Sequence, residues 1–153
     1  HARTRAQGYN GPARWEWLTR VKAKLSIPVI ANGDIVSVET ALQCLAETGA
    51  DGVMCSRGTL GYPFLVGEID YFLKTGQHKP IPTAIQRLEC AKEHLQALYD
   101  YKGERGIQQA RKHMTWYAKG FSGAADLRNR LCAIATVKEW VDSIDQAIAD
   151  MSA

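Results

Sequence analysis

Residues 27–63, which read IPVIANGDIVSVETALQCLAETGADGVMCSRGTLGYP, decide the fold of the first half of the chain. Two short apolar runs, IPVIA and GVMC, each end abruptly in a small polar turn, NGD at 32–34 and SRG at 56–58. Short continuous apolar runs are typical of strands buried on both faces of a parallel sheet. Between the two runs, Ser37 can cap a helix that Gly49 ends. The stretch therefore predicts a strand–helix–strand unit.

The segments on either side continue this alternation. Apolar residues spaced by three or four predict a helix that begins at Pro12 and runs to Leu25, and a second helix over residues 64–73 that Gly76 closes. Helices that alternate with buried strands indicate βα units of a parallel sheet or barrel. Residues 75–83 are mostly polar and contain two prolines, which predicts a linker between two domains.

Beyond this linker the strand signals disappear. Apolar periodicity predicts helices at 83–101, 107–119, 124–135 and 137–151. We expect glycines to interrupt the chain between the helices, namely Gly103, Gly106, Gly120 and Gly123. Helices joined by such short connections predict a compact all-α bundle.

The composition is that of a globular protein, with 153 residues of which 46% are apolar. The sequence contains neither an apolar run of the roughly 18 residues that span a bilayer nor an N-terminal signal. We therefore expect a cytoplasmic protein with no membrane partner. Because the sequence begins at His1 in a motif typical of a strand end, we also expect a piece of a longer protein.

The cysteines are scattered along the sequence, at Cys44, Cys55, Cys90 and Cys132. No two of them form a CxxC pair, and no histidine lies at a metal-ligand spacing from any of them. We therefore predict reduced thiols and no metal site. None of the thiols carries a catalytic signature.

Basic residues are concentrated in one segment, although the net charge at pH 7 is only +3. Lys102–Arg130 contains seven Lys and Arg against Glu104 and Asp126, a local charge of +5. Such a segment is a candidate contact for a polyanion, and the alternative is a solvated basic helix surface. Within it, ARKHMTWY at 110–117 has helical spacing that directs its aromatic residues mainly to the core. The candidate contacts are Arg111, Lys112, His113 and Arg128; for His113, a bond to a core carbonyl is an equal alternative.

The two polar turns suggest a phosphate site. In parallel α/β sheets, ligands bind where strands end and helices begin. Gly33 and Gly58 allow close approach of a ligand to the backbone, and Arg57 adds a fixed positive charge. The alternative is two ordinary strand ends, with Asp34 acting as a helix cap or turn residue.

Four blocks in this order resemble the flavin-dependent tRNA-dihydrouridine synthases, and most closely their bacterial B-type branch. The blocks are HARTR at 1–5, IPVIANGDI at 27–35, TGADGVMCSRGTLGYPFL at 48–65 and ARKHMTWY at 110–117. The resemblance implies that residues 1–79 are the C-terminal part of an FMN-binding (β/α)8 TIM barrel, its last βα units. Residues 80–153 are then a C-terminal helical bundle domain that binds tRNA.

The resemblance also implies roles for particular residues. Asn32, Gly33 and Asp34 match the loop that contacts FMN, and Ser56 and Arg57 match the loop that grips its phosphate. The family usually has glycine in place of Ser56. His1 matches a residue close to the flavin. Arg3 matches one directed toward the tRNA substrate.

The implied reaction is the reduction of uridine to 5,6-dihydrouridine in tRNA, with FMN as cofactor and NADPH as reductant. The family's catalytic cysteine, a general acid, is expected upstream, so the chain alone should lack it and be inactive. The implied partners are tRNA, rather than DNA, and the missing N-terminal half of the barrel.

Three alternatives remain open at this point. The chain could belong to another FMN-dependent TIM-barrel reductase, which would leave the basic helices unexplained. It could be a non-catalytic RNA-binding module in which the βα part is scaffold. The helices could also serve only for dimerisation.

Overall fold

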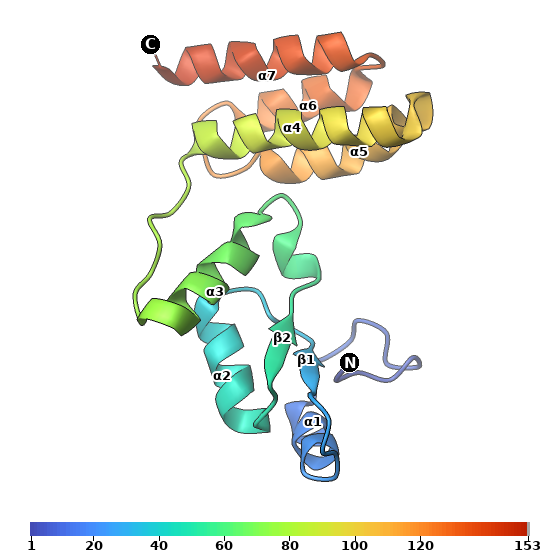
Figure 1. Cartoon of the computed structure of the whole chain (residues 1–153). Coiled ribbons are helices and arrows are strands. Elements are labelled where there is room, and N and C mark those ends of the chain that lie inside the picture. The colour runs from blue at the N-terminus through green and yellow to red at the C-terminus, as the bar shows by residue number, and fades with distance from the viewer. Residues whose placement is uncertain (153) are drawn as a thin grey trace. The chain divides into compact units, whose positions relative to one another are not determined.

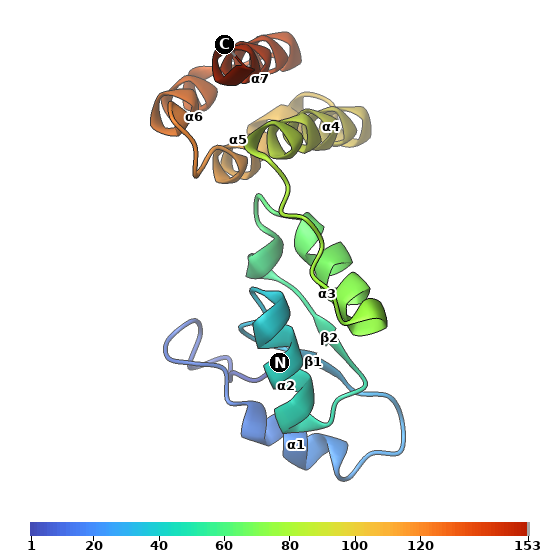
Figure 2. The ribbon, with the colours of Figure 1, turned by 90° about the vertical axis from the view of Figure 1, so that its left-hand side faces the viewer.

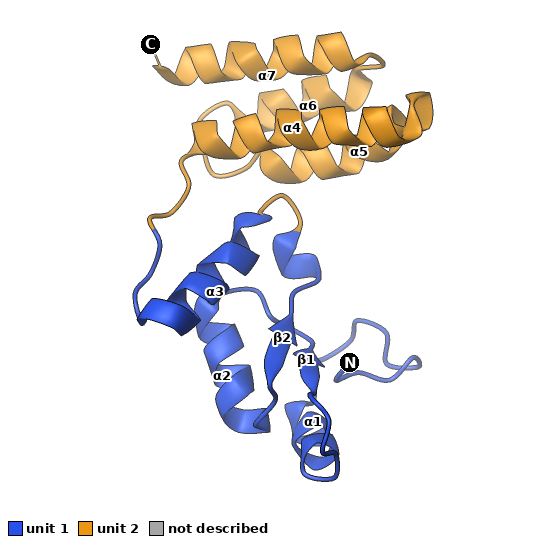
Figure 3. Ribbon diagram, viewed as in Figure 1, with its two compact units in different colours: residues 1–59, 63–79 blue, residues 60–62, 80–153 orange. Residues whose placement is uncertain are grey.

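The computed structural model describes residues 1–152, and these form two compact units, coloured separately in Figure 3. The first unit comprises residues 1–59 and 63–79, and the second comprises residues 60–62 and the chain from Pro80 onward. The first unit combines helices with strands, whereas the second is built on helices. No helix of the described residues is both long enough and apolar enough to cross a bilayer.

The first unit is built around two parallel strands. Its elements are α1 (Trp15–Lys22), β1 (Ile30–Asn32), α2 (Val38–Thr48), β2 (Gly52–Met54), the 3-10 turn η1 (Arg57–Thr59) and α3 (Phe64–Thr75). The register aligns Asn32 with Met54, so the carboxyl ends of both strands lie at the same edge. Helix α2 packs on both strands and contacts α1 and α3 (Figure 1). This is the strand–helix–strand unit that the sequence predicts.

The ends of α2 and α3 confirm the predicted start and stop signals. The Ser37 hydroxyl accepts the Thr40 amide at 3.1 Å, while the Thr40 hydroxyl oxygen accepts the Ser37 amide at 2.9 Å. This reciprocal capping box satisfies amides that the first helical turn leaves unpaired. Gly49 and Gly76 end their helices with φ of 64° and 70°, a left-handed conformation that glycine adopts without a Cβ penalty.

The predicted start of the first helix at Pro12 is wrong, because α1 begins at Trp15. The Ala13 amide donates to the Asp34 carboxylate at 2.7 Å, and the Arg14 amide donates to the Ala2 carbonyl at 2.8 Å. These tertiary hydrogen bonds hold the backbone before Trp15 in a non-helical conformation.

The strands are also less buried than expected. Ile30 is 57% exposed and Met54 is 52% exposed, so the prediction of strands buried on both faces is wrong for this structure. Among the described elements, α2 is the helix that packs on both strands, and it covers one face of the sheet.

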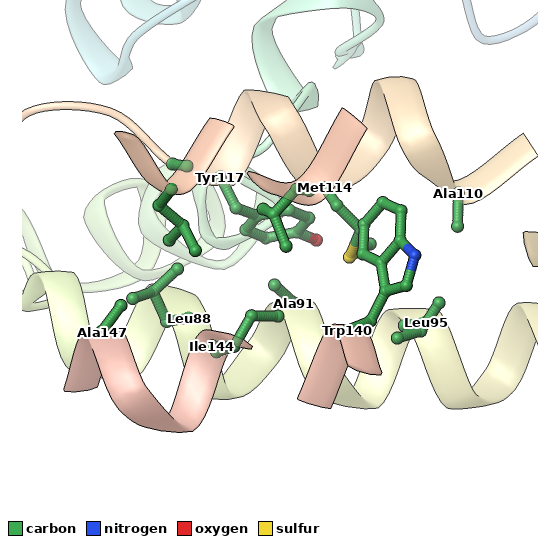
Figure 4. Packing of buried hydrophobic residues seen from close by; sticks show 12 residues of the cluster. Leu88, Ala91, Leu95, Ala110, Met114, Tyr117, Trp140, Ile144 and Ala147 are labelled. Atoms are coloured by element: carbon green, nitrogen blue, oxygen red, sulfur yellow. The ribbon is translucent and has the colours of Figure 1, made fainter. Parts of the chain in front are cut away.

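The second unit is a ring of helices around one core. Its helices are α4 (Ala84–Lys102), α5 (Glu104–Tyr117), α6 (Ala124–Ala133) and α7 (Val137–Ser152). Helices α4 and α6 each pack against both α5 and α7, as the turned view in Figure 2 shows. Figure 4 shows the core, in which Trp140 is fully buried between apolar side chains of the other helices. The same core also contains Leu88, Leu95, Met114, Leu127 and Leu131.

Gly106 does not break the chain as predicted, because it lies inside α5. A Cβ at this position would lie 2.2 Å from the Leu98 carbonyl oxygen, so the glycine allows α4 and α5 to approach each other closely. Gly103, with φ of 57°, alone separates the two helices. The glycine at position 106 therefore permits close packing of two helices and does not end a helix.

Candidate functional site

The two polar turns meet at one edge of the sheet in the first unit. The Asn32 side-chain amide donates to the Met54 carbonyl at 2.7 Å, which ties the ends of β1 and β2 together. A Cβ on Gly58 would lie 2.4 Å from the Ile35 carbonyl oxygen, so the turns after the two strands are in direct contact. A cavity of about 400 Å³ opens at this edge. It is lined by His1, Tyr9, Asn32, Gly33, Asp34, Ile35, Val36, Ser56, Arg57 and Gly58.

All six residues expected to contact a cofactor therefore line the same cavity. The structure brings together His1, the NGD turn and the SR pair, although they are separated by up to 56 positions in the sequence. Tyr9 also lines the cavity, and the sequence reasoning missed it. The one available signal was an aromatic residue in a glycine-containing loop shortly after the HARTR block.

Asp34 links three segments of the first unit. Its carboxylate accepts two hydrogen bonds from Arg3 Nη2, at 2.8 and 2.6 Å, and one from the Ala13 amide at 2.7 Å. A second cationic group, the Arg57 guanidinium, lies 3.7 Å away. The residue has φ of 58°, the one positive φ among the described non-glycine residues. Its carboxylate is therefore engaged mainly by protein donors.

The protonation of Asp34 reflects these contacts. Burial by itself raises the pKa of this carboxyl, but the hydrogen bonds from Arg3 and Ala13 and the positive charges of Arg3 and Arg57 outweigh it. The net pKa is below the ordinary value of 3.8, so Asp34 is ionised at neutral pH.

Arg3 and Arg57 differ in their availability. The Arg3 side chain is 5% exposed and also donates to the Gly11 carbonyl, so it is held inside the unit. The Arg57 side chain is 50% exposed and packs over the ring of Tyr9, with 4.4 Å between the guanidinium carbon and the ring centroid. Arg57 is thus oriented by a cation–π contact while its guanidinium faces solvent.

Further hydrogen bonds hold the two turns and His1. The Gly33 carbonyl accepts the indole N–H of Trp15 at 2.9 Å, which fixes the first turn. The Ser56 carbonyl accepts both the amide and the hydroxyl of Thr59, which fixes the second. His1 Nδ1 accepts the Arg3 amide at 3.0 Å. The arrangement presents one accessible guanidinium beside two fixed turns, which suits a phosphate group.

The cations of the basic segment 102–130 take no part in the ion pairs found among the described residues of the second unit. The ion pairs found there among the described residues join Lys92 to Glu89 and Asp145, and Lys138 to Asp142. None of these involves a cation of the segment 102–130. That segment therefore keeps its excess positive charge. The exposed cations are Lys102, Arg105, Arg111, Lys112, Lys119 and Arg130.

The four candidate contacts in this unit occupy different surroundings. Arg111 Nη2 reaches the Ile134 carbonyl, between α6 and α7, at 3.4 Å. Lys112 is exposed. His113 is half-buried beside the ring of His94, with ring centroids 5.2 Å apart. Arg128 is half-buried and donates to the Ala118 carbonyl at 2.7 Å.

Arg87 has a similar structural role and was not singled out from the sequence. Its Nη2 donates to the Lys119 carbonyl at 3.0 Å, next to the carbonyl that Arg128 binds. The two guanidinium groups therefore satisfy the carbonyls of the two residues that directly follow α5. Nothing in the local sequence around Arg87 distinguishes it from a solvated helix residue.

The strand-end cavity and the basic helices define an α/β protein with a candidate phosphate site and an accompanying cationic helical unit. The family model described as "Dihydrouridine synthase (Dus)" matches residues 1–152. The chain therefore belongs to the dihydrouridine synthase family.

Individual relatives agree with this assignment. A protein from Synechocystis sp. named "Probable tRNA-dihydrouridine synthase 1" is 64% identical over 149 residues, covering 97% of this chain and 42% of that protein. A "Probable tRNA-dihydrouridine synthase" from Rickettsia bellii is 48% identical over 129 residues, 84% of this chain and 40% of that protein. "tRNA-dihydrouridine synthase B" from Xanthomonas axonopodis is 45% identical over 129 residues, 84% of this chain and 39% of that protein.

These names confirm the family resemblance found in the four sequence blocks, including its B-type branch. The chain spans about two fifths of the length of these relatives.

Proposed function

We propose that this chain is part of an FMN-dependent tRNA-dihydrouridine synthase that reduces uridine to 5,6-dihydrouridine in tRNA. The observation that carries the proposal is the meeting of the NGD and SRG turns, with an accessible Arg57, at one cavity in a chain of this family. In this proposal residues 1–79 are the last βα units of a (β/α)8 barrel, and residues 80–153 are the tRNA-binding domain. The enzyme acts in the cytoplasm.

The cavity residues fit the phosphate end of FMN. Arg57 can donate charge-assisted hydrogen bonds to phosphate oxygens, and its guanidinium packs over the Tyr9 ring. Gly33 and Gly58 allow the two turns to pack closely on the protein behind the cavity, since a Cβ would lie 2.8 Å from the Ala13 Cβ at Gly33 and 2.4 Å from the Ile35 carbonyl oxygen at Gly58. His1 and Ser56 complete the wall. FMN held there would supply the hydride chemistry, with NADPH as its reductant.

We place the general acid outside this chain. Among the described residues that line the cavity, none is a cysteine. Cys44 is fully buried in α2, and burial raises the pKa of its thiol. Cys55 follows β2 directly and is half-buried, with a pKa also raised by burial. We therefore expect the chain alone to be catalytically inactive.

The helical unit supplies the RNA contacts in this proposal. Lys112 is exposed and Arg111 extends along the surface from the same helix, so both can meet backbone phosphates. Arg128 and Arg87 hold the end of α5 instead. Arg3 orders Asp34, and through it the cavity wall, rather than reaching the tRNA itself. Binding energy from the helical unit offsets the cost of unstacking the target uridine.

The cofactor site is tested on the longer protein by flavin binding. Arg57→Ala should lower the affinity for FMN at least about tenfold, since a charge-assisted contact to phosphate is lost. Arg20→Ala, which removes an exposed arginine of α1 that does not line the cavity, is the matched control and should leave the affinity unchanged. The measurement is quenching of FMN fluorescence on titration. Equal affinity of the two variants would contradict the assigned phosphate contact.

The RNA surface is tested on the chain itself by titration with folded tRNA. Arg111→Ala/Lys112→Ala should weaken binding and reduce the slope of log affinity against log salt by about two. Lys74→Ala/Lys138→Ala removes two exposed lysines outside the basic segment and should change neither. Unchanged affinity of the first variant in a low-salt gel shift would exclude this face. Absence of any tRNA binding would favour the dimerisation alternative.

A further inference from the structure

Two imidazoles lie together between α4 and α5. The rings of His94 and His113 have centroids 5.2 Å apart, and the ring of Trp116 stands edge-on to His113 at 5.1 Å. His94 Nδ1 shares a hydrogen bond with the Tyr117 hydroxyl at 3.2 Å. Both histidines are half-buried, so part of each remains exposed to solvent.

Lysines border this pair. Lys112 adjoins His113 on α5, and Lys102, at the end of α4, donates to the Gln109 side chain at 2.7 Å, one turn before His113. We refer to His94, Lys102, Lys112, His113 and Trp116 together as the histidine patch.

The groups that face His113 are all basic or neutral. The charged or titratable groups that act on its imidazole are His94 and Lys102 from α4 and Lys112 from α5 itself. The titratable groups beside His94 are His113 and Tyr117. The Tyr117 hydroxyl in turn lies 3.9 Å from the Cys90 thiol on α4. The histidine patch thus concentrates positive charge.

Protonation of the pair is disfavoured in the free protein. Burial lowers the pKa of both histidines, and for His113 the positive charges of His94, Lys112 and Lys102 lower it further. Both imidazoles are therefore mostly neutral at pH 7. A bound anion would reverse the electrostatic part of this effect, because it stabilises the imidazolium and offsets the lysine charges.

A metal ion does not explain the pair. Among residues 1–152 no group of three or more His, Cys, Asp and Glu side chains is arranged to hold one. A phosphate, by contrast, needs donors and positive charge, and two imidazoles with two lysines provide both.

We propose that the histidine patch is a phosphate subsite for RNA that takes up a proton when RNA binds, so that the helical unit binds RNA more tightly as the pH falls. The inference rests on the proposed RNA binding of this unit and adds a dependence on pH to it. If the pKa of an imidazole is about one unit higher in the RNA-bound protein than in the free protein, the affinity for RNA is about tenfold higher at a pH below both pKa values than at a pH above both.

The test is the affinity of the chain for a fluorescent folded tRNA, measured by anisotropy from pH 5.5 to 8.5 at constant ionic strength. Affinity should rise by up to about tenfold toward low pH, and His113→Gln should remove most of this rise. His78→Gln is the matched control, because His78 lies in the first unit, 3.9 Å from Glu39, and should leave the pH dependence intact. Arg111→Ala should weaken binding at every pH without removing the dependence.

A second measurement does not require a variant to fold. The NMR titration midpoint of the His113 ring should move to higher pH when RNA is added. Binding with the same pH dependence in His113→Gln, together with an unmoved midpoint, would overturn the proton-linked subsite alone. No RNA binding at any pH would overturn both this inference and the proposed RNA surface.

Discussion

Replacing Asp34 by alanine should destabilise the first unit by about 3 kcal/mol. Removing one partner of a buried ion pair costs about 3–5 kcal/mol, because the remaining charge stays buried without its counter-ion. Arg3 is 5% exposed and so meets this condition, whereas Asp34 is 35% exposed, which places the expected loss at the low end of that range. The loss includes the hydrogen bond from the Ala13 amide, which holds the segment before α1.

The assay follows the indole N–H of Trp15, which donates to the Gly33 carbonyl beside Asp34. Its NMR signal, recorded against urea, reports the unfolding free energy of this unit. Asp34→Ala, Arg3→Met and the double variant form a double-mutant cycle, with an expected coupling of about 2 kcal/mol. The double variant should therefore lose about 2 kcal/mol less unfolding free energy than the sum of the losses in the two single variants.

The control is Asp70→Ala, since Asp70 and Lys74 form an exposed pair with side chains 60% and 71% exposed. Loss of such a surface pair should change stability by less than about 0.5 kcal/mol. If Asp34→Ala behaved like this control, or if the cycle were additive, the structural role assigned to Asp34 would be refuted.

The same carboxylate gives the first unit a dependence on pH. The pKa of Asp34 is lowered on folding, so its contribution is fully present above the ordinary pKa of 3.8 and is lost as the pH falls through the lower folded value. Wild-type protein should therefore lose more stability on acidification below pH 4 than Asp34→Ala does. Urea unfolding at a series of pH values measures this difference.

Three further outcomes are expected. Gly106→Ala should lower the melting temperature of the second unit and reduce its unfolding free energy by about 1–3 kcal/mol, since the new Cβ would lie 2.2 Å from a carbonyl oxygen of α4. The control is Gly67→Ala, which should not destabilise the first unit, because the nearest atom to its new Cβ is the end of a lysine side chain at 3.7 Å. Ser37→Ala should cost about 1 kcal/mol in urea unfolding through loss of the α2 cap. A thiol reagent should modify the exposed Cys132 well before the buried Cys44, whose pKa burial raises, and equal rates would contradict the burial of α2.

Local signals in the sequence were sufficient where the governing interactions are local. Ser37 and Gly49 mark the ends of α2 correctly, because capping involves residues within four positions of each other. The start of α1 was mispredicted because it is decided by Asp34, 21 positions from Ala13. Gly106 was misread for the same reason, since the contact that requires glycine is with a different helix.

The candidate cavity was predicted through two motifs and the parallel pairing of their strands. Parallel strands bring their carboxyl ends to one edge, so the meeting of Gly33 and Arg57 follows from topology. The role of Tyr9 does not follow from topology, because Tyr9 is a loop residue with 78% exposure, and its contact with Arg57 joins positions far apart in the sequence. The role of Arg3 depends likewise on a tertiary ion pair.

The charge balance at the cavity explains why one arginine remains available to an anion. Two guanidinium groups face a single carboxylate, and Asp34 lies 2.6 Å from Arg3 but 3.7 Å from Arg57. Because the closer and more buried contact is the stronger one, Arg3 takes most of the neutralising effect of Asp34. Arg57, half exposed and oriented by Tyr9, retains most of its positive charge at the cavity wall. Without the Tyr9 contact, Arg57 would carry the same charge but would have no preferred orientation. With Asp34 at hydrogen-bonding distance, most of that charge would be neutralised. At 3.7 Å from Asp34 and packed on Tyr9, Arg57 keeps both its charge and its orientation.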